Sequence, residues 1–375
     1  MASSSSSFFV LLVLLNTITR LIITNPGTTC NASSTVVPPK FPAILVFGDS
    51  TVDTGNNNFI PTAFKGCHPP YGREFPGHIP TGRFSDGRLV PDLLASALGI
   101  KKLVPPFLDP LLSDKELCTG VSFASAGSGY DDLTTVVSRV IPVSQQLQYF
   151  KEYIKRLNKA VGEHKAKKII NGALVMISGG SNDFLINFYD LPTRSLQFNI
   201  SGYQDFLLQK LQDIIKELFD LGCRNFIVAG VPPFGCAPIQ ITAKLKNTPA
   251  RTCIEEENKD ARAYNSKLKR VVKKLEESCE GSKMVYLNIY DPFMDMINQP
   301  QKYGFVETKK GCCGNGLVEV GPLCNLLTPP CANASEYLFW DAIHPGEVAY
   351  THITRYVLDH AHMLFTIPTT PAKAN

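Results

Sequence analysis

Short apolar runs alternate along this chain with amphipathic stretches. The run FPAILVFG at 41–48 is continuously apolar and ends in glycine, which is typical of a strand buried on both faces. Similar runs occupy 121–127, 173–180, 225–230 and 284–289. Between them, apolar residues recur at helical spacing over 88–99, 143–161, 203–222 and 253–278. Strands separated by amphipathic helices predict βαβ crossovers and an α/β fold with a mostly parallel, five-stranded sheet.

This alternation continues without an internal repeat or a long linker. Length alone would allow two or three domains, but α/β folds of more than about 200 residues often form one unit. We therefore expect a single domain over 36–365, followed by a flexible tail at 366–375. Sheets of this kind bind ligands at the carboxyl ends of their strands, so we expect the catalytic residues there.

The N-terminus carries a separate apolar segment. After MASSSSS, the run FFVLLVLL contains eight apolar residues, whereas a bilayer span takes about 20. This predicts a secretory signal peptide over 1–30, with cleavage between about residues 20 and 35. A membrane anchor is the alternative, because LIIT extends the apolar stretch past Arg20. No later segment approaches transmembrane length, so we expect no transmembrane span in the mature chain.

Composition narrows the functional classes. With 44% hydrophobic and 19% charged residues, the chain is too apolar and too weakly charged for a disordered protein. Its formal net charge of +4 is spread along the sequence without a basic block. We therefore expect neither a nucleic acid nor an anionic membrane surface as a partner.

Cysteine usage points to an oxidising compartment. The chain has 11 cysteines, none in the C-x-x-C spacing of a metal site, so we expect no metal. We interpret Cys312, Cys313, Cys324 and Cys331 as a loop held by disulfides, with the pairing left open. The N-x-S/T sequons at Asn31, Asn199 and Asn333 fit the same compartment, and we expect glycans at Asn199 and Asn333.

Several common catalytic motifs are missing from the sequence. It contains no G-x-S-x-G, no P-loop and no H-E-x-x-H. The stretch GSGYDD at 127–132 comes nearest to a dinucleotide fingerprint, but it has Asp132 where the third glycine belongs.

The strand ends carry a different set of reactive side chains. The first strand runs into Gly48-Asp49-Ser50, and DAIHP at 341–345 precedes the last helical pattern. A hydroxyl nucleophile needs a base within hydrogen-bond reach, and the base needs an orienting carboxylate. Ser50, His344 and Asp341 supply these three groups. An Asp three residues before a His can place its carboxylate at Nδ1 while Nε2 faces the serine.

Four blocks in order resemble the plant-type GDSL esterase/lipase family of the SGNH hydrolase superfamily: FGDSTVDTGNN, SFASAGSGYDD, GGSND and DAIHP. The stretch PPYGREFPGHIPTGRFSDGRLVPDLLA also resembles the family, and the similarity covers about 40–360. The resemblance implies a flavodoxin-like three-layer α/β/α sandwich. It also implies that Ser50, Asp341 and His344 form the triad. The oxyanion hole would use the Ser50 N–H, the Gly127 N–H and the Asn182 side chain.

Some residues of these blocks have structural alternatives. Taken singly, Gly127 would serve only a tight turn and Asn182 would cap a helix. Thr51 stands where the family name has leucine, and we expect this departure to leave the chemistry intact. Asp53 and Asn56 are assigned to shaping the loop behind Ser50. No catalytic role is assigned to five further histidines, His68, His78, His164, His360 and His362.

The sequence therefore predicts a secreted, extracellular serine hydrolase that cleaves carboxylic esters through an acyl-enzyme on Ser50, with no cofactor. An acyltransferase using the same residues is the alternative, because the two differ only in acceptor access and water exclusion. A non-catalytic secreted glycoprotein is disfavoured, because all five positions of the triad and oxyanion hole are intact. The substrate stays open among lipid esters, acylated polysaccharides and small acyl conjugates.

Overall fold

A parallel sheet of four strands forms the centre of the fold, as seen in the computed structural model, which describes residues 40–244 and 251–361. The described residues all fall within one compact unit. The predicted signal peptide at 1–30, the sequon at Asn31 and the tail at 366–375 lie outside them. The strands are β1 (Ile44–Gly48), β2 (Leu174–Ser178), β3 (Asn225–Ala229) and β4 (Lys283–Leu287), in the order β1-β2-β3-β4.

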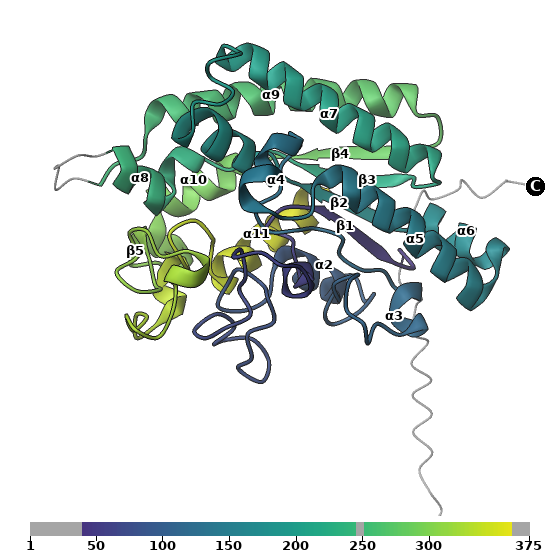
Figure 1. Ribbon diagram of the computed structural model, residues 1–375, viewed down its shortest axis with the longest axis horizontal. Coiled ribbons are helices and arrows are strands. Elements are labelled where there is room, and N and C mark those ends of the chain that lie inside the picture. Colours follow the sequence, from purple (N-terminus) through teal and green to yellow (C-terminus); the bar gives the residue numbers. More distant parts are fainter. Residues whose placement is uncertain (1–39, 245–250, 362–375) are drawn as a thin grey trace, which may run out of the picture. The chain divides into compact units, whose positions relative to one another are not determined.

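Helices cover both faces of this sheet (Figure 1). Alternate side chains of the strands pack against the two helical layers. In β1, Leu45 and Phe47 join the core under one helical layer, and Ile44 and Val46 join the core under the other. The first layer contains α5 (Val143–Val161), α6 (Glu163–Gly172), α7 (Ile200–Asp220) and α9 (Glu255–Ser278). The second contains α2 (Val90–Ala97), α10 (Tyr290–Asn298) and α11 (Glu347–His360). The predicted three-layer α/β/α class is confirmed.

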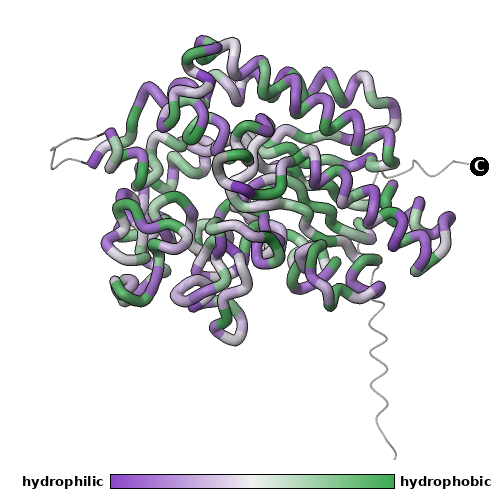
Figure 2. The backbone as a smooth tube through the Cα atoms, in the orientation of Figure 1, coloured by the Kyte–Doolittle hydropathy of each residue, from purple (hydrophilic) through white to green (hydrophobic). Residues whose placement is uncertain are grey.

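Hydropathy along the backbone follows these layers, with hydrophobic positions gathered on the central strands and mixed positions on the outer helices (Figure 2). The four helical patterns read from the sequence correspond to α2, α5, α7 and α9. The short helices are α3 (Asp114–Cys118), α4 (Asp132–Ser138) and α8 (Pro238–Lys244), together with the π-helix η2 (Asp183–Asp190). The 3₁₀ turns are η1 (Asn56–Phe59), η3 (Phe234–Cys236), η4 (Pro300–Tyr303), η5 (Gly321–Leu323) and η6 (Ala334–Glu336).

The five-strand count is only approximate. The segment expected as a strand at 121–127 runs beside β1, where the Val46 N–H donates to the Val121 carbonyl at 3.1 Å. Beyond one parallel bridge between Val46 and Ser122, it forms no strand of the sheet. The ladder with β1 is incomplete because the Gly48 N–H donates to the side-chain Oε1 of Gln146 at 2.9 Å and not to this segment.

A second, small sheet was not anticipated from the sequence. It pairs β5 (Glu307–Gly311) with β6 (Tyr337–Phe339) in parallel. Because β6 leads directly into residues 340–345, this sheet fixes the start of the loop that carries Asp341 and His344.

Disulfides close the loop that follows β5. Cys312 pairs with Cys331 and Cys313 pairs with Cys324, so the predicted disulfide-held loop is confirmed and its pairing is now defined. A third disulfide, Cys236–Cys253, was not anticipated. Among the described cysteines, Cys67, Cys118, Cys223 and Cys279 are free.

Within residues 40–244 and 251–361, no helix has the length and apolar character needed to cross a bilayer.

Candidate active site

The carboxyl end of β1 presents Ser50 at a sharp turn of the backbone. Gly48 has a φ of 138°, a conformation that favours glycine. A Cβ at this position would lie 1.7 Å from the Ser178 carbonyl oxygen at the end of β2. Gly48 therefore allows β1 to pass close to β2 before the chain turns and places Asp49 and Ser50 in the wall of the pocket.

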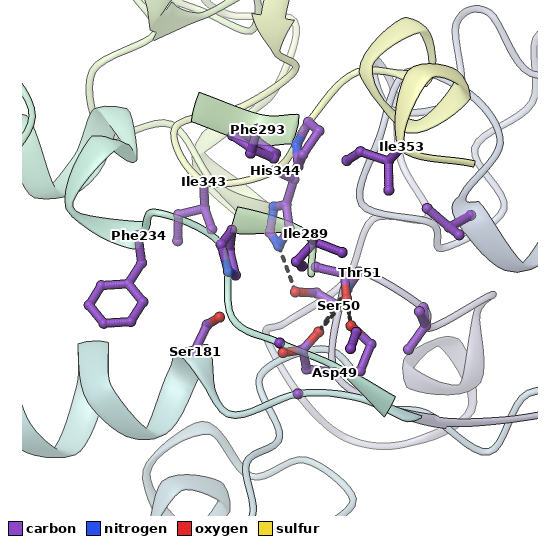
Figure 3. Close-up of a pocket in the computed structure, with 18 of the residues that line it drawn as sticks. Asp49, Ser50, Thr51, Ser181, Phe234, Ile289, Phe293, Ile343, His344 and Ile353 are labelled. Carbon is purple, nitrogen blue, oxygen red and sulfur yellow. Dashed lines mark hydrogen bonds between the residues drawn. The ribbon is translucent and has the colours of Figure 1, made fainter. Parts of the chain in front are cut away.

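Ser50, His344 and Asp341 form a continuous chain of hydrogen bonds. The Ser50 Oγ lies 2.7 Å from His344 Nε2 (Figure 3). On the other side of the ring, His344 Nδ1 lies 2.7 Å from Asp341 Oδ2. The three residues are buried, with exposed fractions of 6% for Ser50, 4% for His344 and 0% for Asp341. The structure thus brings together the nucleophile, base and carboxylate candidates from opposite ends of the chain.

The loop after β6 explains why a spacing of three residues suits this pair. Asp341 Oδ1 accepts hydrogen bonds from the backbone N–H groups of Ile343 at 2.8 Å and His344 at 2.7 Å. The tight turn thereby directs Oδ2 toward the imidazole. A carboxylate at Nδ1 favours the tautomer with the proton on Nδ1, so Nε2 has a free lone pair for the serine hydroxyl.

Thr51 makes its side-chain contacts away from the triad. Its Oγ1 donates to Asp49 Oδ1 at 2.8 Å and lies 3.0 Å from Ser178 Oγ. Burial raises the pKa of Asp49, and the hydrogen bonds from Thr51 partly oppose this rise. The threonine in place of leucine therefore supports the buried carboxyl that precedes Ser50.

Asp53 and Asn56 tie the loop after Ser50 to the segment beside β1. Asp53 Oδ2 accepts from the Ala126 N–H at 2.9 Å, and Asn56 Nδ2 donates to the carbonyls of Ser122 and Ala124. Burial raises the pKa of Asp53 to about 6. Both side chains are fully used in backbone contacts, which is what a loop-shaping role requires.

Asn182 lies at the start of η2 and lines the same pocket as Ser50. Its Nδ2 donates to the Ser128 carbonyl at 2.9 Å, and its side chain makes no capping hydrogen bond to η2. An amide NH₂ carries two donor protons, so one remains for a ligand in the pocket. The geometry at η2 therefore gives the capping alternative no support.

Gly127 lies in the turn that follows the segment beside β1. It is buried with a φ of 87°, and a Cβ there would meet the Phe64 ring at 3.0 Å. Its carbonyl accepts from Ser138 Oγ at 3.2 Å. Gly127 is not among the residues that line the pocket with Ser50 and Asn182. Its oxyanion role therefore stays a prediction.

The pocket around Ser50 has mainly apolar walls. Phe234 and Ile343 lie on one side of the Ser50–His344 pair and Ile353 lies on the other (Figure 3). Further apolar lining comes from α2, α10 and the ends of β2 to β4. Neither Lys nor Arg occurs among the lining residues. This environment accommodates uncharged, apolar groups on both sides of the nucleophile.

Two residues that support the triad were not predicted from the sequence. Phe84 places its ring centroid 4.9 Å from that of His344, and the Tyr71 hydroxyl donates to Asp341. Both lie in the stretch that follows the first family block, but no spacing rule relates them to residues some 260 positions away.

In the part of the chain that the structure describes, no cluster of His, Cys, Asp and Glu is arranged to hold a metal.

Comparison with known proteins gives a consistent match over this whole region. The family model described as GDSL-like Lipase/Acylhydrolase matches residues 44–357. The Arabidopsis thaliana protein GDSL esterase/lipase At2g30310 is 55% identical over 331 residues, covering 88% of this chain and 92% of that protein. GDSL esterase/lipase At1g06990, also from Arabidopsis thaliana, is 47% identical over 348 residues, covering 91% and 97%.

Proposed function

The chain belongs to the GDSL-like lipase/acylhydrolase family of carboxylic ester hydrolases, and on this premise we propose that it acts through an acyl-enzyme formed on Ser50. The observation that carries the proposal is the hydrogen-bond chain from Ser50 through His344 to Asp341 at the edge of an apolar pocket. A serine hydroxyl paired with an oriented imidazole is the arrangement needed for nucleophilic acyl transfer.

In the proposed mechanism, Ser50 Oγ attacks the ester carbonyl while His344 Nε2 takes the hydroxyl proton. The resulting oxyanion accepts hydrogen bonds from the Ser50 N–H and from the free donor of Asn182, with Gly127 N–H as the third donor implied by the family. Asp341 stabilises the imidazolium. His344 then gives its proton to the leaving alkoxide as the carbon–oxygen bond breaks. Water, activated in the same way by His344, releases the acid and restores Ser50.

The lining of the pocket favours uncharged esters with apolar chains over acylated polysaccharides. A polysaccharide presents many hydroxyl groups, each of which loses hydrogen bonds to water when it enters an apolar site. An alkyl chain gains about 0.8 kcal/mol for each methylene that it buries. Since Ile289, Phe293 and Ile353 line the pocket, an alkyl acyl chain is the better fit.

A chain-length series tests this substrate class. With p-nitrophenyl esters from acetate upward, kcat/KM should rise about fourfold for each added methylene until the pocket is filled. Acetylated cell-wall polysaccharide should be hydrolysed far more slowly, and a Ser50→Ala preparation gives the background rate. A preference for acetyl esters, with polysaccharide as the best substrate, would contradict the proposed class. Adding an alcohol acceptor and analysing the products distinguishes hydrolysis from acyl transfer.

Secretion is the second part of the proposal. Three disulfides and the exposed sequon residues Asn199 and Asn333 support it. Disulfides persist in oxidising compartments, and glycosylation needs an accessible asparagine.

Mass spectrometry of the full chain produced in plant cells tests the compartment. The mature protein should begin after residue 20, carry glycan at Asn199 or Asn333, and contain the three disulfides. Replacing both asparagines with glutamine should remove the glycan mass without changing the mature N-terminus. A protein that retains Met1 and has reduced cysteines would overturn the secretory assignment.

A further inference from the structure

The hydrogen-bond chain of the triad continues beyond Asp341 to Tyr71. The Tyr71 hydroxyl donates to Asp341 Oδ2 at 2.7 Å, the same oxygen that faces His344 Nδ1. Tyr71 is buried, with an exposed fraction of 1%. With the two backbone donors from Ile343 and His344 on Oδ1, the carboxylate receives four hydrogen bonds in all. Four donors saturate the lone pairs of a carboxylate, so its orientation is fixed on both oxygens.

The direction of the Tyr71 hydrogen bond is defined by a second partner. The Gly321 N–H donates to the Tyr71 hydroxyl oxygen at 2.8 Å. The phenol oxygen therefore accepts from Gly321, and its own proton is directed to Asp341. Burial and the neighbouring Asp341 carboxylate raise the pKa of Tyr71 well above its ordinary value. The phenol thus stays protonated and acts as a donor at physiological pH.

Tyr71 is itself held in place by aromatic packing and by the disulfide-bonded loop. Its ring packs edge-on against Phe84 at 5.4 Å and Trp340 at 6.2 Å between ring centroids. Gly321 belongs to η5, inside the loop that the Cys313–Cys324 disulfide closes. The phenol therefore connects this covalently constrained loop to the carboxylate of the triad.

The same loop also holds the backbone around Asp341. The Cys313 N–H donates to the Trp340 carbonyl at 2.7 Å, and the Ala342 N–H donates to the Glu319 carbonyl at 2.9 Å. These bonds fix the residues directly before and after Asp341. Tyr71 is the contact that extends this constraint from the backbone to the side chain.

We propose that Tyr71 is a positioning residue of the active site, which holds the Asp341 carboxylate, and through it the His344 imidazole, in line with Ser50. The proposal rests on the catalytic role proposed for these three residues. Tyr71 does not line the pocket, so it acts on turnover through Asp341 and has no direct contact with an ester in the site.

The isosteric variant Tyr71→Phe tests this role, because it removes the hydroxyl and keeps the packed ring. We expect kcat to fall about 10-fold to 100-fold, as small misplacements of catalytic groups and lost bonds to charged groups both reduce turnover strongly. KM should stay within about twofold, since the pocket lining is unchanged. A fall confined to KM, or a kcat within twofold of wild type, would overturn the proposal.

Tyr264→Phe is the matched control. Tyr264 is fully buried, and its hydroxyl has no hydrogen-bond partner among the described residues. It packs against Phe184 and is not part of the pocket lining. Removing this hydroxyl should leave kcat within twofold of wild type. An equal fall of kcat in both variants would mean that removing any buried hydroxyl from the core lowers turnover. That result would contradict a specific role for Tyr71.

A spectroscopic measurement separates this proposal from the proposed catalytic function. The proton between His344 Nδ1 and Asp341 Oδ2 should give a low-field ¹H NMR signal in the resting enzyme. Tyr71→Phe should shift this signal because one of the two donors to Oδ2 is lost, and Tyr264→Phe should not. An unchanged signal in Tyr71→Phe overturns the positioning role. Turnover by Ser50→Ala would overturn the proposed catalytic function. The NMR signal is measured without an ester, so it tests the Tyr71–Asp341 hydrogen bond independently of turnover.

Discussion

Replacing Ser50 with alanine should lower kcat by about 10⁵-fold to 10⁶-fold. Without Oγ there is no nucleophile for the carbonyl, and the acyl-enzyme route is closed. His344→Ala should have a similarly large effect, and the double variant should lose little more, because the two residues act as one unit. Initial rates on the best ester of the chain-length series, measured at protein concentrations determined from absorbance, provide the test.

Ser181→Ala is the matched control for Ser50→Ala. Ser181 is another serine in the lining of the same pocket (Figure 3). The bond from His344 Nε2 goes to Ser50, so loss of the Ser181 hydroxyl should change kcat by only a few fold. A fluorophosphonate probe should label the peptide that contains residue 50 in wild type and in Ser181→Ala. Near-wild-type turnover by Ser50→Ala would disprove the mechanism.

The parts of the fold that were predictable from sequence are those in which local pattern and burial agree. The apolar runs at 41–48, 173–180 and 225–230 are buried on both faces and contain β1, β2 and β3. The run at 121–127 is also buried, yet its ladder with β1 is incomplete because the Gly48 N–H donates to Gln146 Oε1. Whether an apolar run completes a ladder depends on which residues lie beside it in the fold. The spacing of apolar residues along the chain does not contain that information.

The parts of the candidate site that could be predicted are those whose residues lie close together in the sequence. Asp341 and His344 are three residues apart, and that spacing fixes their mutual geometry. Tyr71 and Gly321 are separated by 250 positions, and only the folded loops bring them together. Cys236–Cys253 was missed for the same reason, since neither cysteine lies in a recognisable cluster.

Asn182→Ala should reduce kcat by about 10²-fold to 10³-fold, the usual effect of removing one oxyanion donor. KM should change little, because this hydrogen bond strengthens only as negative charge develops on the carbonyl oxygen. The variant also loses the bond from Nδ2 to the Ser128 carbonyl, which should lower the free energy of unfolding by about 1 kcal/mol. Steady-state kinetics and thermal unfolding should be measured on the same preparation.

Asn199→Ala, made in a host that adds no glycan, is the control that separates the two effects. The Asn199 side chain caps α7 by accepting from the Gly202 N–H at 2.8 Å, so its loss should also cost about 1 kcal/mol of stability. Asn199 is exposed and outside the pocket lining, and kcat should therefore stay at the wild-type value. With stability losses matched, a large difference in kcat must come from chemistry at Asn182. If the two variants instead lose similar stability and both keep their kcat, Asn182 is a structural residue and the oxyanion must depend on backbone donors alone.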